Sequence, residues 1–262
     1  MAHLSASQFL NMFRKSVDGC GGAPYSLNMF KETAVRALPQ RASSEATRRQ
    51  IVETALALFR ERGFDETTMR DIAGRAGLSL GAAYYYFKSK EAIVGAYYDY
   101  IQEAHQSRAR EVCAKAHDLR GRLRAALHAK IDILQQDRRL LRALFRYGGE
   151  PSHPLSWFGP ATRQQRELSI AVFAEAIGDE RLPPDVRDAA PTLLWTLHMG
   201  VLLFFLYDAS PGERRTRRLI DQAVDFVVDA KRVAASPLLR PIRRRVFGIL
   251  RDAGLLAPTG AA

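Results

Sequence analysis

The chain has 262 residues, of which 47% are hydrophobic and 26% charged, values ordinary for a soluble protein with one fair-sized domain or a small module joined to a larger one. Its two cysteines, Cys20 and Cys113, lie far apart without metal-type spacing, which excludes a disulfide framework and favours a reducing cytoplasm. The formal net charge of +11 favours an anionic partner such as nucleic acid. Because the positive excess is spread along the whole chain, composition does not locate the binding face.

The longest apolar run, residues 192–207, is short for a bilayer span and contains His198, so we expect a buried core helix. Near the N-terminus, charged residues follow the apolar ones and no small-residue cleavage site follows a long apolar stretch. This segment therefore does not resemble a secretory signal. We expect a cytoplasmic protein without a membrane partner.

Residues 1–43 lack a sustained helical period and contain the stretches GCGGAP (19–24) and LPQRASS (38–44). Glycine and proline at this density indicate irregular structure, although a short helix at 27–37 fits the pattern. An alternative is a start codon assigned too early, with translation beginning near Met29. We take 1–43 as an irregular N-terminal extension.

The pattern changes at Ser44, a good N-cap for a helix of roughly four turns that Gly63 ends. Its apolar positions recur at three- and four-residue steps: Ile51, Val52, Ala55, Leu56 and Phe59.

A second helix is expected at Thr68, because Asp71 three residues later completes a capping box. Gly77 ends this helix, since glycine adopts a positive φ at little cost. Ser79 then caps a short third helix that extends through Phe87, and Ser89 caps a fourth.

Two short helices joined by a glycine-containing turn are the signature of a helix-turn-helix motif, here at about 68–87. The second helix of such a motif enters the major groove of DNA. The residues expected to fill the space between the two helices are Ile72, Ala73, Ala76, Leu78, Ala83 and Tyr86. Helical pairs with similar turns also occur in proteins that bind no DNA, so the spacing alone leaves both readings open.

The remainder of the chain is helical by its periodicity, and no segment alternates with the period of two that a half-buried strand requires. The expected helical runs are 89–116, 120–147, 160–178, 185–207 and 213–235. We therefore predict an all-α fold in which an N-terminal three-helix helix-turn-helix module precedes a larger helical domain.

The segment TRRQIVETALALFRERGFDETTMRDIAGRAGLSLGAAYYYFKSKEAIVGAY (47–98) resembles the DNA-binding module of the TetR (tetracycline-repressor) family. The resemblance implies a cytoplasmic, homodimeric transcription regulator, usually a repressor, whose helical C-terminal domain binds a small molecule and dimerises. By this resemblance the domains are 44–94 for DNA binding, 95–235 for effector binding and dimerisation, and 236–262 as a basic tail. Ala82-Ala83 and Tyr85 depart from the family's usual Thr-Leu and His, which leaves the base preference open.

The third helix places Ala83, Tyr86 and Phe87 on its inward face, because each helical residue advances by about 100°. Tyr84 and Tyr85 therefore point outward, where a tyrosine hydroxyl suits a DNA phosphate. The alternative is that both are ordinary surface aromatics. The resemblance also implies phosphate contacts from Tyr84 and Lys90, to which the N–H groups at the start of the fourth helix add donors.

The third helix carries none of the side chains that make bidentate base contacts, so we expect close approach at Gly81 and Ala82 and a contribution from DNA shape. Arg70 could contact a guanine or a phosphate, and the sequence favours neither. The Arg48-Arg49 pair could contact the flanking DNA backbone or form a solvated charged face. The expected DNA-binding residues are Thr67, Thr68, Arg70, Ser79, Leu80, Gly81, Ala82, Tyr84, Tyr85, Lys88 and Lys90.

The helix expected at 185–207 is apolar on almost every side, which requires burial on more than one side. In a dimer that packs helix pairs into a four-helix bundle, one side would face its own core and the other the partner subunit. We predict a homodimer through this helix and the one at 213–235. A pocket implied by the family resemblance has an apolar lining, which favours a hydrophobic or aromatic effector, although each residue is also a good core residue. The expected lining residues are Phe145, Trp157, Phe158, Trp195, His198 and Met199.

No catalytic constellation, phosphate loop or cofactor motif stands out, and His117 with His128 lacks a third metal ligand, so we expect neither an enzyme nor a metal or cofactor site. The tail at 238–256 is a basic amphipathic helix with Ile242, Val246, Ile249 and Leu250 on its apolar side. Such a helix docks on its own domain or binds a membrane or partner groove, and we expect the former.

The leading hypothesis is a homodimeric repressor that binds a palindromic operator and is released by a small apolar ligand. The alternative is a constitutive or architectural DNA-binding regulator without an effector. Release from DNA by a small molecule separates the two. The operator, the regulated genes and the effector do not follow from the sequence.

Overall fold

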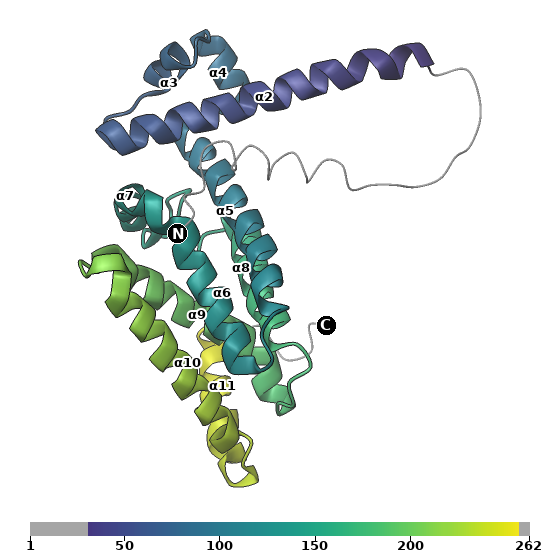
Figure 1. The fold of residues 1–262 in the computed structure, drawn as a ribbon, viewed down its shortest axis with the longest axis vertical. Helices are drawn as coiled ribbons and strands as arrows, with labels where there is room; N and C mark the ends of the chain where they lie inside the picture. The colour runs from purple at the N-terminus through teal and green to yellow at the C-terminus, as the bar shows by residue number, and fades with distance from the viewer. Residues whose placement is uncertain (1–30, 257–262) are drawn as a thin grey trace. The chain divides into compact units, whose positions relative to one another are not determined.

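The computed structural model describes residues 31–256, with side chains from Ser43 onward except at position 232. The described chain consists of helices, turns and irregular segments without a β-strand, in agreement with the all-α prediction (Figure 1). The α-helices are α2 (Lys31–Arg62), α3 (Met69–Arg75), α4 (Leu80–Tyr86), α5 (Lys90–Cys113), α6 (Leu119–Leu134), α7 (Arg138–Gly148), α8 (Arg163–Ile177), α9 (Pro184–Tyr207), α10 (Arg214–Ala234) and α11 (Arg240–Asp252). Three 3₁₀ turns, η1 (Gln135–Asp137), η2 (Pro211–Glu213) and η3 (Pro237–Leu239), complete the order.

The described residues divide into two units between Ala46 and Thr47. Residues 31–43, expected to be irregular apart from a short helix that the pattern allowed at 27–37, are helical, and Ser44 lies inside α2 instead of capping it. Ser44 does not begin a helix here, because a serine caps a helix only where the preceding backbone is not helical, and α2 runs without a break from Lys31 through Pro39 and Ser44. The part of the prediction that concerns residues 1–30 lies outside the described residues.

In the second unit, α3, α4 and α5 begin directly after the residues that the sequence predicts as helix caps. Thr68 and Asp71 form a reciprocal capping box at the start of α3, and Gly77 adopts a φ of +68° in the turn. The side chains of Ser79 and Ser89 accept hydrogen bonds from the backbone N–H groups of Ala82 and Ala92 at 3.1 and 3.2 Å. These caps fix the orientation of α4 relative to α3, because each satisfies backbone donors that a helix start leaves free.

One hydrophobic cluster runs through the second unit, from Ile51 in α2 to Val224 in α10. Figure 1 shows α5, α6 and α8 side by side, and α10 packs against α6 and α9. The expected boundary at 94/95 falls inside α5, so α5 belongs to both the helix-turn-helix module and the larger helical part.

The helix expected over 120–147 is interrupted by η1, which separates α6 from α7. Asp137 in this turn is buried and accepts hydrogen bonds from Arg60 and Tyr97. The break therefore brings a carboxylate to the end of α2, a tertiary contact that helical periodicity does not encode.

The C-terminal helix α11 packs on α9, but only partly through the predicted apolar side. Phe247 is buried with Ala189 of α9, and the half-buried Leu250 packs against this cluster, whereas Ile242, Val246 and Ile249 are exposed. The inward side is set by Phe247 and by Arg243, whose Nε lies 2.7 Å from Oδ2 of Asp185. Burial of the Phe247 ring and the pairing of Arg243 with Asp185 therefore determine which side of α11 faces α9, rather than burial of the smaller aliphatic side chains.

Candidate nucleic-acid interface and ligand pocket

The short helix α4 divides its row of aromatic residues between two environments. Ala83 and Phe87 are buried at 0% and 4% exposure, and Tyr86 is half-buried, so this side packs on the module. Tyr84 and Tyr85, 42% and 76% exposed, form what we call the outer tyrosine pair. The helical spacing in the sequence predicts this division, and it leaves the two hydroxyl-bearing rings open to a partner.

The other residues expected at a DNA interface differ in their surroundings. Thr68, Arg70, Ser79, Gly81 and Lys88 are exposed, and Leu80, Ala82 and Lys90 are half-buried. Among the described residues Arg70 makes no ion pair, so its guanidinium is open to a DNA contact. Thr67 is buried at 1% exposure, and its hydroxyl donates to the carbonyl of Gly63 at 2.7 Å. The side chain of Thr67 therefore holds the turn before α3 and does not reach the surface.

Lys90, at the start of α5, binds the same turn. Its Nζ donates to the carbonyl oxygens of Phe64 and Asp65 at 2.8 and 3.1 Å and lies 3.4 Å from that of Thr67. It also lies 4.4 Å from the centroid of the Phe64 ring. An ammonium group has three donors, so a phosphate contact from Lys90 requires it to leave at least one carbonyl.

The turn at residues 63–67 also contacts α7, in the larger part of the unit. The Asp65 carboxylate accepts hydrogen bonds from Arg146 and from the Tyr147 hydroxyl. The rings of Phe64 and Tyr147 meet edge to face at 5.7 Å. Residues at the end of α7 thus hold the segment from which α3 begins.

A cavity of about 110 Å³ lies among α5, α6, α7, α8 and α9. Five of the six residues expected to line a ligand pocket lie around it: Phe145, Trp157, Trp195, His198 and Met199. Phe158 does not line it, because its ring is 63% exposed and meets the outer side of Trp195 at 5.7 Å. The predicted aromatic residues therefore converge, with Phe158 as the exception.

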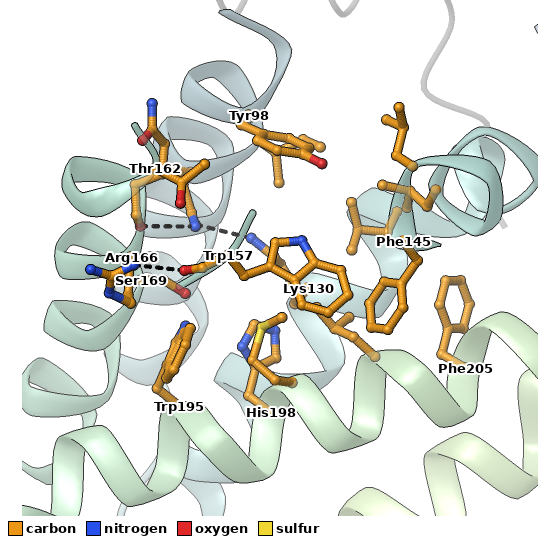
Figure 2. A pocket seen from close by; sticks show the side chains of 18 of the residues that line it. Tyr98, Lys130, Phe145, Trp157, Thr162, Arg166, Ser169, Trp195, His198 and Phe205 are labelled. Carbon is orange, nitrogen blue, oxygen red and sulfur yellow. Dashed lines mark hydrogen bonds between the residues drawn. The ribbon is translucent and has the colours of Figure 1, made fainter. Parts of the chain in front are cut away.

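Trp157 projects toward the middle of this pocket, with Phe145 on one side and Trp195 and His198 below it (Figure 2). Its ring lies 3.7 Å from that of Phe145, centroid to centroid. A Cβ added at Gly148 would come within 2.2 Å of the indole, so the close packing requires glycine at this position. The indole is thus held against the end of α7.

The polar lining of the pocket contains a buried cation that was not predicted. Lys130 is 3% exposed, and its Nζ donates to Oε1 of Gln102 at 3.0 Å. It occupies the apolar stripe of α6 with Leu123, Leu127 and Leu134, and a lysine on such a stripe was the available signal. Burial lowers the pKa of Lys130 to about 7, because a charged ammonium loses its hydration there.

Two buried histidines lie beside Lys130. Burial, with a further contribution from the Lys130 charge, lowers the pKa of His105 to about 3 and that of His198 well below its ordinary value. The His105 ring is held by a hydrogen bond of 2.9 Å between Nε2 and the carbonyl of Ala126. Both ring nitrogens of His198 are buried without a hydrogen-bond partner, although it lines the pocket.

The helices α9 and α10 expose large apolar side chains at the surface of the single chain. The exposed residues are Leu193, Leu203, Phe204 and Tyr207 on α9 and Phe226 and Val233 on α10. By length and composition α9 is also long and apolar enough to cross a membrane, a test that core helices of soluble proteins pass too. Exposed apolar patches of this kind mark interaction surfaces.

Within residues 31–256 no cluster of three or more His, Cys, Asp or Glu side chains has the arrangement of a metal site. Nε2 of His128 lies 3.0 Å from Oδ1 of Asp221, and His117 is exposed. The two histidines therefore have separate surroundings.

Comparisons with known proteins agree on one family. Residues 51–97 match the family model of the bacterial regulatory proteins, tetR family, and residues 122–243 match that of the tetracyclin repressor-like C-terminal domain. The HTH-type transcriptional repressor KstR2 of Mycolicibacterium smegmatis is 26% identical over 159 residues, covering 56% of this chain and 74% of that protein. The HTH-type transcriptional regulator TtgR of Pseudomonas putida is 40% identical over 70 residues, covering 27% and 33%.

Solved structures show the same fold. A TetR transcriptional regulator from Nitrosomonas europaea aligns with a TM-score of 0.56 at 22% identity, over 68% of this chain and 96% of that one. A TetR-family regulator from Syntrophomonas wolfei aligns with a TM-score of 0.57 at 18% identity, over 70% and 95%. Because the two family models together match more than half of the residues, the chain belongs to the TetR family and is a DNA-binding transcriptional regulator, not an enzyme.

Proposed function

We propose that the protein is a homodimeric, cytoplasmic repressor that binds a palindromic operator and leaves it when a small molecule occupies the pocket. The observation that carries this proposal is the position of α7, whose residues both line the pocket and bind the turn before α3. Phe145 lies in the pocket, and the next two residues, Arg146 and Tyr147, bind Asp65.

The DNA side of the proposal rests on the surface of α4 and its surroundings. The outer tyrosine pair offers hydroxyl groups for phosphates, and Gly81 leaves room for close approach to the groove. Arg70 and Lys88 are exposed and add positive charge at the two ends of the motif. Lys90 would contribute indirectly, through the turn it holds.

The ligand side rests on the arrangement of Trp157 and Phe145. A molecule entering the cavity meets the Trp157 indole, which is wedged against Gly148 at the end of α7. A ligand shifts an equilibrium only as far as it prefers one of two conformations. We infer that the bound molecule favours a position of α7 that alters the contacts of Arg146 and Tyr147 with Asp65 and so reorients α3 and α4.

The homodimer is supported by the exposed apolar side chains of α9 and α10. A two-fold interface on these helices would cover Leu203, Phe204 and Phe226, which the single chain leaves 45%, 42% and 75% exposed. A dimer of helix-turn-helix modules binds two half-sites, which is why we expect a palindromic operator. The same interface accounts for the apolar surface of α9 without a membrane. The relative named KstR2 is a repressor, which favours repression here.

The test is a footprint on DNA fragments from upstream of the protein's own gene and of the neighbouring genes. We expect a protected site with two-fold symmetry, and we expect a small molecule that raises the melting temperature of the protein to release it. A matched Gly148→Ala variant, which forces the indole out of place, should bind DNA but respond weakly to the same molecule. An asymmetric footprint, or a stabilising ligand that leaves DNA affinity unchanged, contradicts the proposal.

A further inference from the structure

Lys130 is a buried cation without a counter-ion. Among the described residues no carboxylate forms an ion pair with its ammonium group, and its one hydrogen bond goes to the neutral Gln102 side chain at 3.0 Å. The nearby acid Asp99 accepts a hydrogen bond from Gln165 at 2.6 Å. A buried charge is costly to fold unless an opposite charge or several acceptors compensate it. The lowered pKa of Lys130 reflects the same cost.

Further polar atoms of the pocket lack a partner. Both ring nitrogens of His198 and Oγ of Ser169 are buried without a hydrogen bond, in side chains that are 2% and 1% exposed. The Ser169 hydroxyl and the single N–H of the neutral His198 ring can each donate a hydrogen bond to an oxygen of a ligand, and unpaired buried polar groups are rare in folded proteins. The oxygen Oε1 of Gln165 is also unpaired. Because an amide oxygen only accepts hydrogen bonds, Oε1 of Gln165 does not contribute to the binding of an anion.

Arg166 and Thr162 also line the pocket, but both already donate hydrogen bonds to backbone carbonyls, and the remainder of the lining is apolar. Leucine, phenylalanine and methionine side chains form its other wall, among them Leu134, Phe145 and Met199. Its volume of about 110 Å³ is close to that of an engineered cavity of about 150 Å³ that binds benzene. The space therefore fits a single ring or a short branched chain.

We propose that the effector of this pocket is a small organic acid, whose carboxylate pairs with Lys130 and whose apolar ring or branched chain fills the space beside Trp157. The proposal rests on the ligand-responsive function proposed above and names the class of its ligand. The carboxylate supplies the charge and the acceptors that Lys130 lacks, and Ser169 and His198 donate to its oxygens. A hydrocarbon effector would leave Ser169 and His198 without a partner, and a neutral polar effector would give Lys130 no opposite charge.

The experiment compares acids with their neutral amides of the same shape: benzoate with benzamide, and isovalerate with isovaleramide. Binding to the full-length protein is measured by calorimetry and by thermal shift up to millimolar concentration. At least one acid should bind, roughly ten-fold or more tightly than its amide, since a charge-assisted hydrogen bond is about twice as strong as a neutral one. If neither acid binds, or if each amide binds as tightly as its acid, the proposal is wrong.

Lys130→Met tests the role of the charge. Methionine is unbranched and of similar length, and it removes the cost of burying an unpaired charge, so this variant should fold. It should lose the preference for the acid while the amide binds as before, whereas Lys115→Met, which removes an exposed lysine, should leave the preference unchanged. Ser169→Ala gives a second variant that should weaken the acid more than the amide. A Lys130→Met protein that still prefers the acid overturns the proposal.

A DNA-release measurement separates this proposal from the function on which it rests. If an acid binds through Lys130 but does not change operator affinity, the ligand class is right and the proposed response is wrong. If a neutral molecule releases the protein from DNA and the acids do not bind, the response is right and the ligand class is wrong.

Discussion

Nε of Arg60, in the last turn of α2, lies 2.7 Å from Oδ1 of Asp137 in the turn between α6 and α7. The other carboxylate oxygen accepts a hydrogen bond of 2.6 Å from the Tyr97 hydroxyl. Because Asp137 is buried, this contact joins the first helix of the DNA-binding module to the part of the chain that holds the pocket. It adds a second connection to that of Asp65 with α7.

Replacing Asp137 by alanine should lower the free energy of unfolding by about 1–3 kcal/mol, because the buried Tyr97 hydroxyl loses its acceptor. Urea unfolding at neutral pH measures this. Asp132→Ala is the control: it removes an exposed pair with Arg217, which is worth at most about 1 kcal/mol. Equal stability of the Asp137 variant and the wild type would show that the contact is not part of the folded state in solution.

The helix boundaries around the motif follow from local chemistry and could be predicted. Thr68, Ser79 and Ser89 each cap a helix through a side-chain oxygen, and Gly77 takes the positive φ that other residues avoid. These effects depend on residues within one turn of each other. The exposure of the outer tyrosine pair follows in the same way from helical spacing.

Features that depend on distant residues could not be predicted. The break between α6 and α7 brings Asp137 into contact with Arg60 and Tyr97. In α11, Phe247 faces inward on the side where Arg243 pairs with Asp185 of α9. Lys130 lies on the apolar stripe of α6, which helical periodicity alone predicts to be part of the core. It lines a pocket because residues of α9, among them His198, lie around the same cavity. The local pattern of apolar residues predicts which face of a helix is buried, but it does not predict which residues of other helices pack against that face.

Tyr84→Phe should weaken binding to all DNA sequences alike, by about 0.5–1.5 kcal/mol, the contribution of one hydrogen bond. The reason is that an exposed hydroxyl at this position suits a phosphate and carries no base information. Fluorescence anisotropy with operator and unrelated DNA measures both affinities. Tyr86→Phe is the matched control on the same helix. Because the Tyr86 ring faces inward, loss of its hydroxyl should change neither the affinity for operator DNA nor that for unrelated DNA. A change in sequence preference would assign Tyr84 to base reading instead.

Phe204→Glu should convert the protein to a monomer at micromolar concentration. Phe204 is 42% exposed in the single chain, so the charge should not disturb the subunit's own core but would be buried without a partner in the proposed interface. Sedimentation velocity measures the mass. Ala174→Glu, on the exposed side of α8, should leave the dimer intact. A wild-type protein that sediments only as a monomer would remove the basis of the prediction.

Phe247→Ala should destabilise the protein by about 3 kcal/mol, at the low end for a buried phenylalanine because the surrounding cluster is small and can collapse. Deletion of 237–262 should likewise lower the melting temperature. Ile249→Ala, on the exposed side of α11, should have little effect. Unchanged melting of the truncated protein would show that α11 serves an external partner and not its own domain.

The free energy of unfolding should fall as the pH is lowered from about 6.5 toward 4.5. In the folded state the pKa of His105 is about 3 and that of His198 is well below its ordinary value, because burial disfavours the charged ring. Over this range the unfolded chain binds protons that the folded chain does not, and each histidine contributes a slope of up to about 1.4 kcal/mol per pH unit. The stability is therefore fully present above the ordinary pKa and is lost as the pH falls below it.

Other groups of the core titrate outside this range. Lys130, with a pKa of about 7, is protonated in both states below about pH 6. Burial alone would raise the pKa of Asp208, but hydrogen bonds from Ser210 and Thr216 hold it well below its ordinary value, so its contribution is lost only in stronger acid. Between about pH 6.5 and 5.5, above the range in which glutamates such as Glu175 and Glu180 take up protons in the unfolded chain, His198→Leu should reduce the slope by about half, since one of the two buried histidines is removed. The exposed His117→Gln should leave the slope unchanged, and an equal slope in the His198 variant and the wild type would contradict the assignment.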